Sequence, residues 1–360
     1  MAEFFETGSA TDVNDLLTRV QTVLTSNGYT LQQSGSEGTG RRVHLSKGDL
    51  YINLRSGVNN EDPISNSGFR WTTAWNWNRY KGNPRVYYST DWLAVNVGSG
   101  FDDSEDWREW YNQPGVQIEV AGNKGKAQFL ETHGAIPKYW MFLQDNPSDA
   151  FWLIVEWAPG RYSWLAFGNV QKSSSYNGGR FYGASRWIND HYGYPHPLNS
   201  CQVQVLDGDF KDENNGWGRT DVSAPNKSTG SSNVIRTPYI PNYQFYSYSS
   251  SYPQHAQYNI LYKSYIKNEA RSVLYPIYGF VQRSSGYSLL GTLPNAFYTS
   301  LEPFVAGDSI DIGGESYLVF PFYDRGSPWV YAQDTSGSAS DWDSYKVYHF
   351  GMGMAIRRPA

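Results

Sequence analysis

Residues 137–171, PKYWMFLQDNPSDAFWLIVEWAPGRYSWLAFGNVQ, contain three apolar and aromatic runs that are separated by the short segments DNPSD and APGR. Asp, Asn, Pro, Ser and Gly are the residues that form tight turns. The three runs are therefore predicted to be consecutive strands of an antiparallel meander. Because the runs are nearly continuously apolar, at least part of this sheet is expected to be covered on both faces.

An amphipathic helix is predicted upstream, over residues 11–27, TDVNDLLTRVQTVLTSN. Ser9 or Thr11 can cap its start, acidic residues in its first turn suit the positive end of the helix dipole, and Gly28 provides a left-handed exit. One face is expected to be buried, because the apolar residues recur with the helical period of 3.6. They are Val13, Leu16, Leu17, Val20, Val23 and Leu24.

Two hairpins are predicted where apolar residues alternate on both sides of a glycine-containing turn. In residues 41–57, RRVHLSKGDLYINLRSG, the turn is SKGD, and the helix is expected to pack on this small sheet. In residues 307–323, GDSIDIGGESYLVFPFY, the turn is the pair of glycines. A last strand is expected within residues 344–358. The predicted fold class is α+β, mostly antiparallel β in sandwich-like sheets and hairpins, with one N-terminal amphipathic helix.

The chain is predicted to have three parts, because residues 207–234 are polar and rich in Gly and Ser. Residues 1–206 form an N-terminal helix plus a β-rich domain, residues 207–265 form a polar and Tyr-rich excursion or arm, and residues 266–360 form a C-terminal β-rich region. Scattered Pro and many Tyr favour an extended arm that lies against a neighbour. The expected arm contacts are Tyr243, Phe245, Tyr246, Tyr248 and Tyr252.

Composition narrows the possible partners. The formal net charge of −5 and the pI near 5.7 oppose binding to a nucleic-acid backbone, which requires a basic surface. No apolar run reaches the roughly 18 to 20 residues that cross a bilayer, so no membrane span is expected. A single Cys201 and a start without a basic and apolar leader are consistent with folding in a cytoplasm.

A cluster of aromatic rings lies in residues 68–84, GFRWTTAWNWNRYKGNP, where Ser, Asn, Gly and Pro indicate a loop. Three interpretations stay open: contact with a protein partner, burial under the loop, and a platform for glycan binding. Trp, Tyr and Arg anchor protein contacts in desolvated pockets, and Trp faces also stack on sugar rings. The candidate contact residues are Trp71, Trp75, Trp77, Arg79 and Tyr80.

Two groups of residues have the chemistry of metal ligands. His191, His196 and Cys201 follow one another in steps of five, which matches neither the close ligand pairs of a structural zinc site nor a helical His pair. A second group, with Lys211 among its members, lacks the order of a calcium loop. It consists of Asp207, Asp209, Asp212 and Glu213. No metal and no cofactor are expected.

Carboxylates near the aromatic strands are the residues that a glycosidase would use as its acid and base. Strand-edge carboxylates are common, and the sequence contains no nucleophile elbow, zincin motif or phosphate loop. No enzymatic activity and no catalytic residue are therefore expected. The carboxylates concerned are Glu119, Glu131, Glu156 and Asp190.

Seven blocks of the sequence carry a family resemblance: residues 10–33, 40–57, 139–172, 176–185, 289–300, 308–322 and 354–358. In this order they resemble large virion structural proteins of tailed bacteriophages. Residues 58–90 and 200–265 lie outside this resemblance. It implies a non-enzymatic β-rich subunit of a virion tail or baseplate, made and assembled in the host cytoplasm, whose partners are copies of itself and other tail or baseplate proteins. The alternative is a host receptor-binding tail module that binds a surface glycan.

Overall fold

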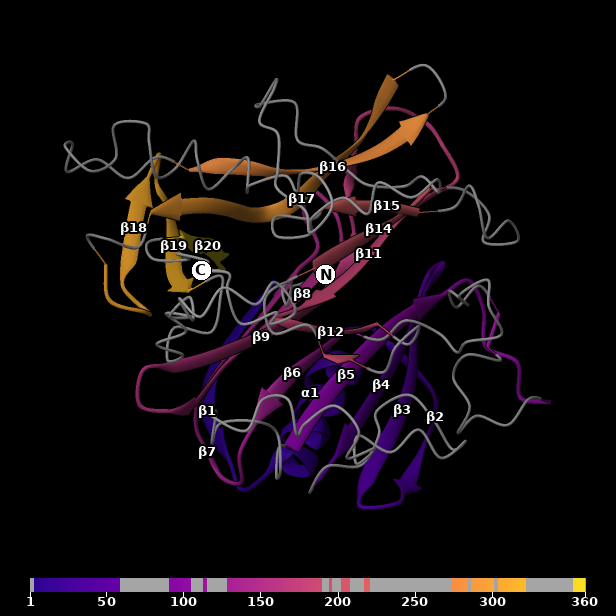
Figure 1. Ribbon diagram of the computed structural model, residues 1–360, viewed down its shortest axis with the longest axis vertical. Helices are drawn as coiled ribbons and strands as arrows, with labels where there is room; N and C mark the ends of the chain where they lie inside the picture. The colour runs from indigo at the N-terminus through magenta and orange to yellow at the C-terminus, as the bar shows by residue number, and fades with distance from the viewer. Residues whose placement is uncertain are drawn as a thin grey trace, which may run out of the picture.

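Three antiparallel β-sheets and one α-helix make up the described part of the chain (Figure 1). This arrangement confirms the predicted fold class of mostly antiparallel β with a single N-terminal helix. The computed structural model describes residues 3–58, 91–104, 113–114, 128–189, 194–195, 202–207, 217–220, 274–283, 286–300, 304–321 and 352–359.

The central sheet comprises seven strands: β1 (Phe4–Ala10), β7 (Ile136–Gln144), β8 (Ala150–Ala158), β9 (Arg161–Asn169), β11 (Gly178–Ala184), β14 (Gln202–Asp207) and β15 (Trp217–Thr220), in that order across the sheet. Strands β7, β8 and β9 are the predicted meander. Their register places Met141 opposite Leu153 and Leu153 opposite Leu165. The prediction of three consecutive antiparallel strands is therefore confirmed.

The N-terminal sheet also comprises seven strands: β13 (Tyr194–Pro195), β12 (Arg186–Asn189), β6 (Gln128–Thr132), β5 (Asp91–Gly98), β4 (Leu50–Gly57), β3 (Gly40–Lys47) and β2 (Thr30–Glu37). The predicted hairpin is β3 and β4, whose two-residue turn contains Gly48 with φ of 59°. Its apolar side chains face one way and are buried, which is the alternation that the sequence predicted. They are Val43, Leu45, Leu50, Ile52 and Leu54.

Helix α1 (Val13–Ser26) contacts strands β1, β3, β4 and β5, as expected for a helix that packs on the hairpin. Its six predicted apolar residues are all buried. The predicted N-cap, Ser9 or Thr11, was wrong, whereas the predicted left-handed exit at Gly28 is confirmed. The N-cap is Asp12, whose carboxylate accepts a hydrogen bond from the Asp15 amide at 2.8 Å, because Ser9 is still part of strand β1. Gly28, with φ of 88°, adopts the left-handed conformation after the helix.

The C-terminal sheet comprises β10 (Gln171–Lys172), β17 (Gly286–Ser300), β20 (Met352–Arg358), β19 (Glu315–Pro321) and β18 (Ser309–Ile312) in that order, and β16 (Tyr275–Arg283) also pairs with β17. The predicted hairpin is β18 and β19. Gly313 and Gly314 both have positive φ, as a two-residue hairpin turn requires. Of the predicted last strand, residues 352–358 form β20, and residues 344–351 lie outside the described residues.

Both faces of the central sheet are buried. On one face, Leu153 and Leu165 belong to an apolar cluster with α1 and the N-terminal sheet. On the other face, Trp152 and Trp164 belong to a second cluster with the C-terminal sheet. The expected double coverage of the meander is confirmed, and it explains why its strands are apolar at successive positions.

Polar contacts fasten the three sheets to one another. In the turn between β7 and β8, Asp149 forms an ion pair with Lys47 of the N-terminal sheet. In the same turn, the Asn146 carbonyl accepts a hydrogen bond from Asn295 of the C-terminal sheet at 2.6 Å. Strands from the first and third predicted parts of the chain also contribute side chains to the same apolar cluster. The predicted division of the chain into domains stays a prediction.

Candidate functional site

The candidate contact residues of the sequence lie outside the described residues. This applies to the aromatic loop, the Tyr-rich arm, and the His and Cys residues considered as metal ligands, so their roles stay predictions. The residues concerned are Trp71, Trp75, Trp77, Arg79, Tyr80, Tyr243, Phe245, Tyr246, Tyr248, Tyr252, His191, His196 and Cys201.

Two of the four candidate catalytic carboxylates, Glu131 and Glu156, are described, and they lie in different sheets. Glu131, on β6, is buried, and its Oε1 lies 3.2 Å from Nε2 of His133.

Glu156, on β8, accepts a hydrogen bond from the Gly160 amide at 3.1 Å and so closes the turn between β8 and β9. Burial, with a smaller contribution from Glu156, raises the pKa of Tyr162 to about 12. The described contacts of Glu156 thus involve the hairpin turn and a strand-paired tyrosine. The other two candidates, Glu119 and Asp190, lie outside the described residues.

A segment without formal charge runs from the second half of α1 into β2. Residues 20–36 contain no Asp, Glu, Lys or Arg, although such residues make up 18% of the chain. Charged side chains are depleted from the buried centres of protein interfaces, so a solvent-facing segment of this length without them is a candidate contact surface. We call it the helix–edge surface. Its exposed residues are Thr22, Ser26, Gly28, Thr30, Leu31, Gln32, Ser34 and Ser36.

Strand β2 forms the outer rim of the N-terminal sheet (Figure 1). Among the described strands, it pairs with β3 alone. A two-residue turn joins β2 to β3, and Glu37 and Gly40 are the pair that flanks this turn. In such a hairpin the flanking pair is hydrogen-bonded, and the next pair along the strands is not. The next pair is Ser36 and Arg41. In agreement, the Arg41 amide donates to Ser56 of β4 at 3.0 Å. By the same alternation, the backbone amides of Ser34 and Ser36 point away from β3, towards the open side of the strand.

The only ionisable side chain of β2 faces away from this open side. The Glu37 carboxylate accepts a hydrogen bond from Nη2 of Arg42 at 2.8 Å and lies 3.5 Å from Nη2 of Arg55. All three side chains are less than one tenth exposed. The charge of Glu37 is thus paired on the sheet face that carries Arg42 and Arg55. The open edge of β2 itself carries no charged side chain.

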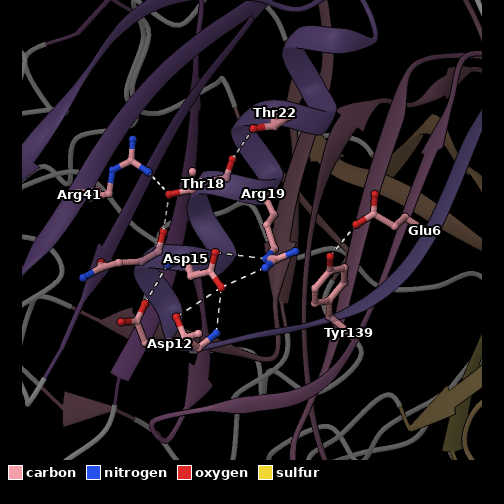
Figure 2. Close-up of polar contacts among 10 residues, drawn as sticks. Glu6, Asp12, Asp15, Thr18, Arg19, Thr22, Arg41 and Tyr139 are labelled. Carbon is pink, nitrogen blue, oxygen red and sulfur yellow. Dashed lines mark hydrogen bonds and ion pairs between the residues drawn. The ribbon is translucent and has the colours of Figure 1, made fainter.

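A network of polar contacts holds α1 against the central sheet (Figure 2). Arg19 binds Asp15 through two contacts of 3.2 and 3.3 Å. The Tyr139 hydroxyl donates to Glu6 of β1 at 2.5 Å and also interacts with Arg19. Burial, and then the hydrogen bond to Glu6, raises the pKa of Tyr139, so its hydroxyl keeps its proton further into the alkaline range than an exposed tyrosine does. It acts as a permanent hydrogen-bond donor that joins the helix, β1 and β7.

A second set of contacts holds α1 against β3. Figure 2 shows the Arg41 guanidinium directed at Thr18, with which it forms a hydrogen bond. Another nitrogen of the same group donates to Gln21 at 3.2 Å. Since the helix is tied to three strands, the helix–edge surface is presented in a fixed shape, which lowers the ordering cost of binding a partner.

Sequence reasoning missed this surface, because neither β1 nor β2 has the apolar alternation of a typical strand. One signal was available: the run of 17 residues without a charged side chain can be read directly from the sequence. In strand β3, Arg42 and His44 alternate with Val43 and Leu45, which indicates a polar face opposite the apolar one.

The chain matches neither a protein-family model nor a curated protein. In the part of the chain that the structure describes, no helix combines the length and the apolarity needed to span a membrane. The same described ranges contain no group of three or more His, Cys, Asp or Glu side chains placed to hold a metal ion.

Proposed function

We propose that the chain is a structural subunit, without enzymatic activity, of a bacteriophage particle, located in the tail or the baseplate. It assembles through contacts with copies of itself and with other tail or baseplate proteins. The proposed location is the virion, after synthesis and assembly in the cytoplasm of the host. The virion assignment rests on the resemblance of the sequence blocks given above.

One observation carries the assembly role: an uncharged surface that faces solvent and adjoins a strand with an open side. Residues 20–36 provide only neutral side chains, and the amides of Ser34 and Ser36 point outwards. An unpaired strand edge offers a row of donors and acceptors to another chain. Because the contacts of Arg19 and Arg41 fix the helix beside it, this surface is ready to bind without reorganisation.

The resemblance blocks support the same role, because they coincide with the framework that presents the surface. Residues 10–33 and 40–57 contain α1, part of β2 and the β3–β4 hairpin, and residues 139–172 contain most of the central meander. A subunit of this kind uses a rigid β framework to display contact segments. The aromatic loop and the Tyr-rich arm, which lie outside the blocks, are proposed to add further contacts.

Two measurements test the proposal. Particles produced from the genome that encodes the chain should contain it, as detected by mass spectrometry of purified virions. The purified chain should also self-associate or bind another virion protein in light scattering. A chain that is absent from the particles, or that stays monomeric alone and with every other virion protein, would contradict the proposal.

A further inference from the structure

We infer that the open side of β2 is a strand-addition site for a second copy of this chain. The inference rests on the proposed function and adds to it the partner, the contact and its register. Two copies pair antiparallel through their β2 strands about a two-fold axis, and this pairing joins their N-terminal sheets into one continuous sheet across the contact.

The edge formed by β2 lacks the protection that soluble proteins usually give to edge strands. Soluble proteins guard their edge strands with Lys or other charges, with Pro, or with bulges. Strand β2, TLQQSGSE, has no Lys, Arg or Pro, and its single carboxylate, on Glu37, is turned to Arg42 and Arg55. Its one irregularity lies between Leu31 and Gln33, which leaves the segment from Gln33 to Glu37 regular. That segment carries both outward-facing amides.

The distribution of charge favours a second copy of the chain as the partner of β2. Each copy has a formal net charge of −5, so two copies repel one another over most approaches. The residues of the helix–edge surface carry no formal charge, and the neighbouring cation Arg41, opposite Ser36, is engaged with Thr18 and Gln21 of α1. Two such surfaces therefore bring few like charges together. A contact between identical chains is favoured where the repulsion between them is smallest.

The outward-facing residues of β2 are arranged symmetrically about Gly35, so the strand is self-complementary. Outward-facing residues of one strand must pair with outward-facing residues of the other. A register centred on Gly35 meets this condition with both serines: Ser34 of each copy lies opposite Ser36 of the other copy, and the two serine pairs exchange four backbone hydrogen bonds. Gly35 then lies on the two-fold axis, at a closely spaced pair where it adds no Cβ between the strands. A two-fold contact uses the same patch on both copies, as this register does.

The experiment introduces like charges at the contact, in the full chain. In the variant Ser34→Lys/Ser36→Lys, each lysine lies opposite a lysine of the second copy, which destabilises an antiparallel pair. The dimer dissociation constant, measured by sedimentation, is expected to rise about tenfold. The variant Ser34→Glu/Ser36→Glu should be impaired in the same way. An equimolar mixture of the two variants should recover association, because every lysine then faces a glutamate.

The matched control is Ser309→Lys/Asp311→Asn on the exposed strand β18. It changes the net charge from −5 to −3, as the double lysine variant does, but leaves β2 intact. Its association should equal that of the unaltered chain. Circular dichroism melting should show that all variants stay folded, since the changed side chains are exposed.

The possible outcomes separate this inference from the proposed function. If the unaltered chain assembles and the lysine variant assembles equally well, or if the mixture shows no recovery, the β2 contact is overturned while the assembly role stands. If the unaltered chain is monomeric alone and with all virion proteins, both are overturned. Loss in each variant with recovery in the mixture supports the contact and its register.

Discussion

Gly8 and Tyr139 lie opposite each other on strands β1 and β7, and the tyrosine ring occupies the space that a side chain on Gly8 would need. A Cβ built on Gly8 would lie 2.5 Å from the Tyr139 hydroxyl oxygen. The same hydroxyl joins Glu6 and Arg19, so this glycine allows the network that fixes α1. The position of α1, and with it of the helix–edge surface, therefore depends on the absence of a side chain at Gly8.

The variant Gly8→Ala tests this relationship. The added methyl group must displace the tyrosine ring, and overpacking of this kind typically costs about 1–3 kcal/mol of unfolding free energy. Urea unfolding followed by circular dichroism measures the change. The control is Ser9→Ala, at the exposed neighbouring position, which should change the stability by less than about 0.5 kcal/mol. Equal stability of Gly8→Ala and the unaltered chain would show that the ring has room to move.

Glu37→Gln should strongly destabilise the N-terminal sheet. The change removes the carboxylate that lies between Arg42 and Arg55, and breaking a buried ion pair costs about 3–5 kcal/mol, because a buried charge loses its partner. Denaturant unfolding provides the measurement. The matched control is Glu315→Gln, whose half-exposed ion pair with Arg357 should contribute less than about 1 kcal/mol. Similar losses in the two variants would argue against a special role of Glu37.

Alkaline pH should destabilise the fold partly through Tyr162. Its pKa rises from 10.0 in the unfolded chain to about 12 in the folded protein, mainly because the side chain is buried. The folded state thus holds this proton more tightly, and its contribution to stability is complete below pH 10 and is lost as the pH rises to about 12. Between these values, Tyr162→Phe should lose less stability than the unaltered chain. If the free energy of unfolding fell equally with rising pH in the two proteins, the raised pKa of Tyr162 would be refuted.

The aromatic loop provides a prediction that rests on the sequence alone. Replacing Trp71, Trp75 and Trp77 together by Ala should weaken assembly and leave unfolding cooperative, because aromatic side chains anchor protein contacts. Light scattering and thermal melting provide the two readouts. Unaltered assembly would mean that the rings have another role, and specific saccharide binding on a glycan array that is lost in Trp75→Ala would favour the glycan-binding alternative.

The fold was predictable where local pattern and tertiary environment agree. The meander of residues 137–171 combines apolar runs with turn residues, and the helix has a regular apolar stripe, so both were found. The glycine turns of the hairpins were found for the same reason. In each case the residues that decide the structure are neighbours in sequence.

The remaining features depend on partners that are distant in the chain. Strands β1 and β2 have polar, Ser- and Gly-containing sequences, and they are strands because β7 and β3 pair with them. The choice of N-cap for α1 also depends on strand pairing that is distant in sequence. Ser9, Thr11 and Asp12 are all residue types that cap helices, and the choice falls on Asp12 because pairing with β7 keeps Ser9 extended. The candidate surface was missed for this reason, since β2 is an edge only in the context of the folded sheet.

Sedimentation velocity of the full chain, over a wide range of concentrations at moderate salt, tests the assembly role most directly. The account predicts that the sedimentation coefficient rises with concentration, from that of a 40.8 kDa monomer to that of a dimer or a larger ring. A single monomeric species at every concentration, unchanged when the other virion proteins are added, would contradict it.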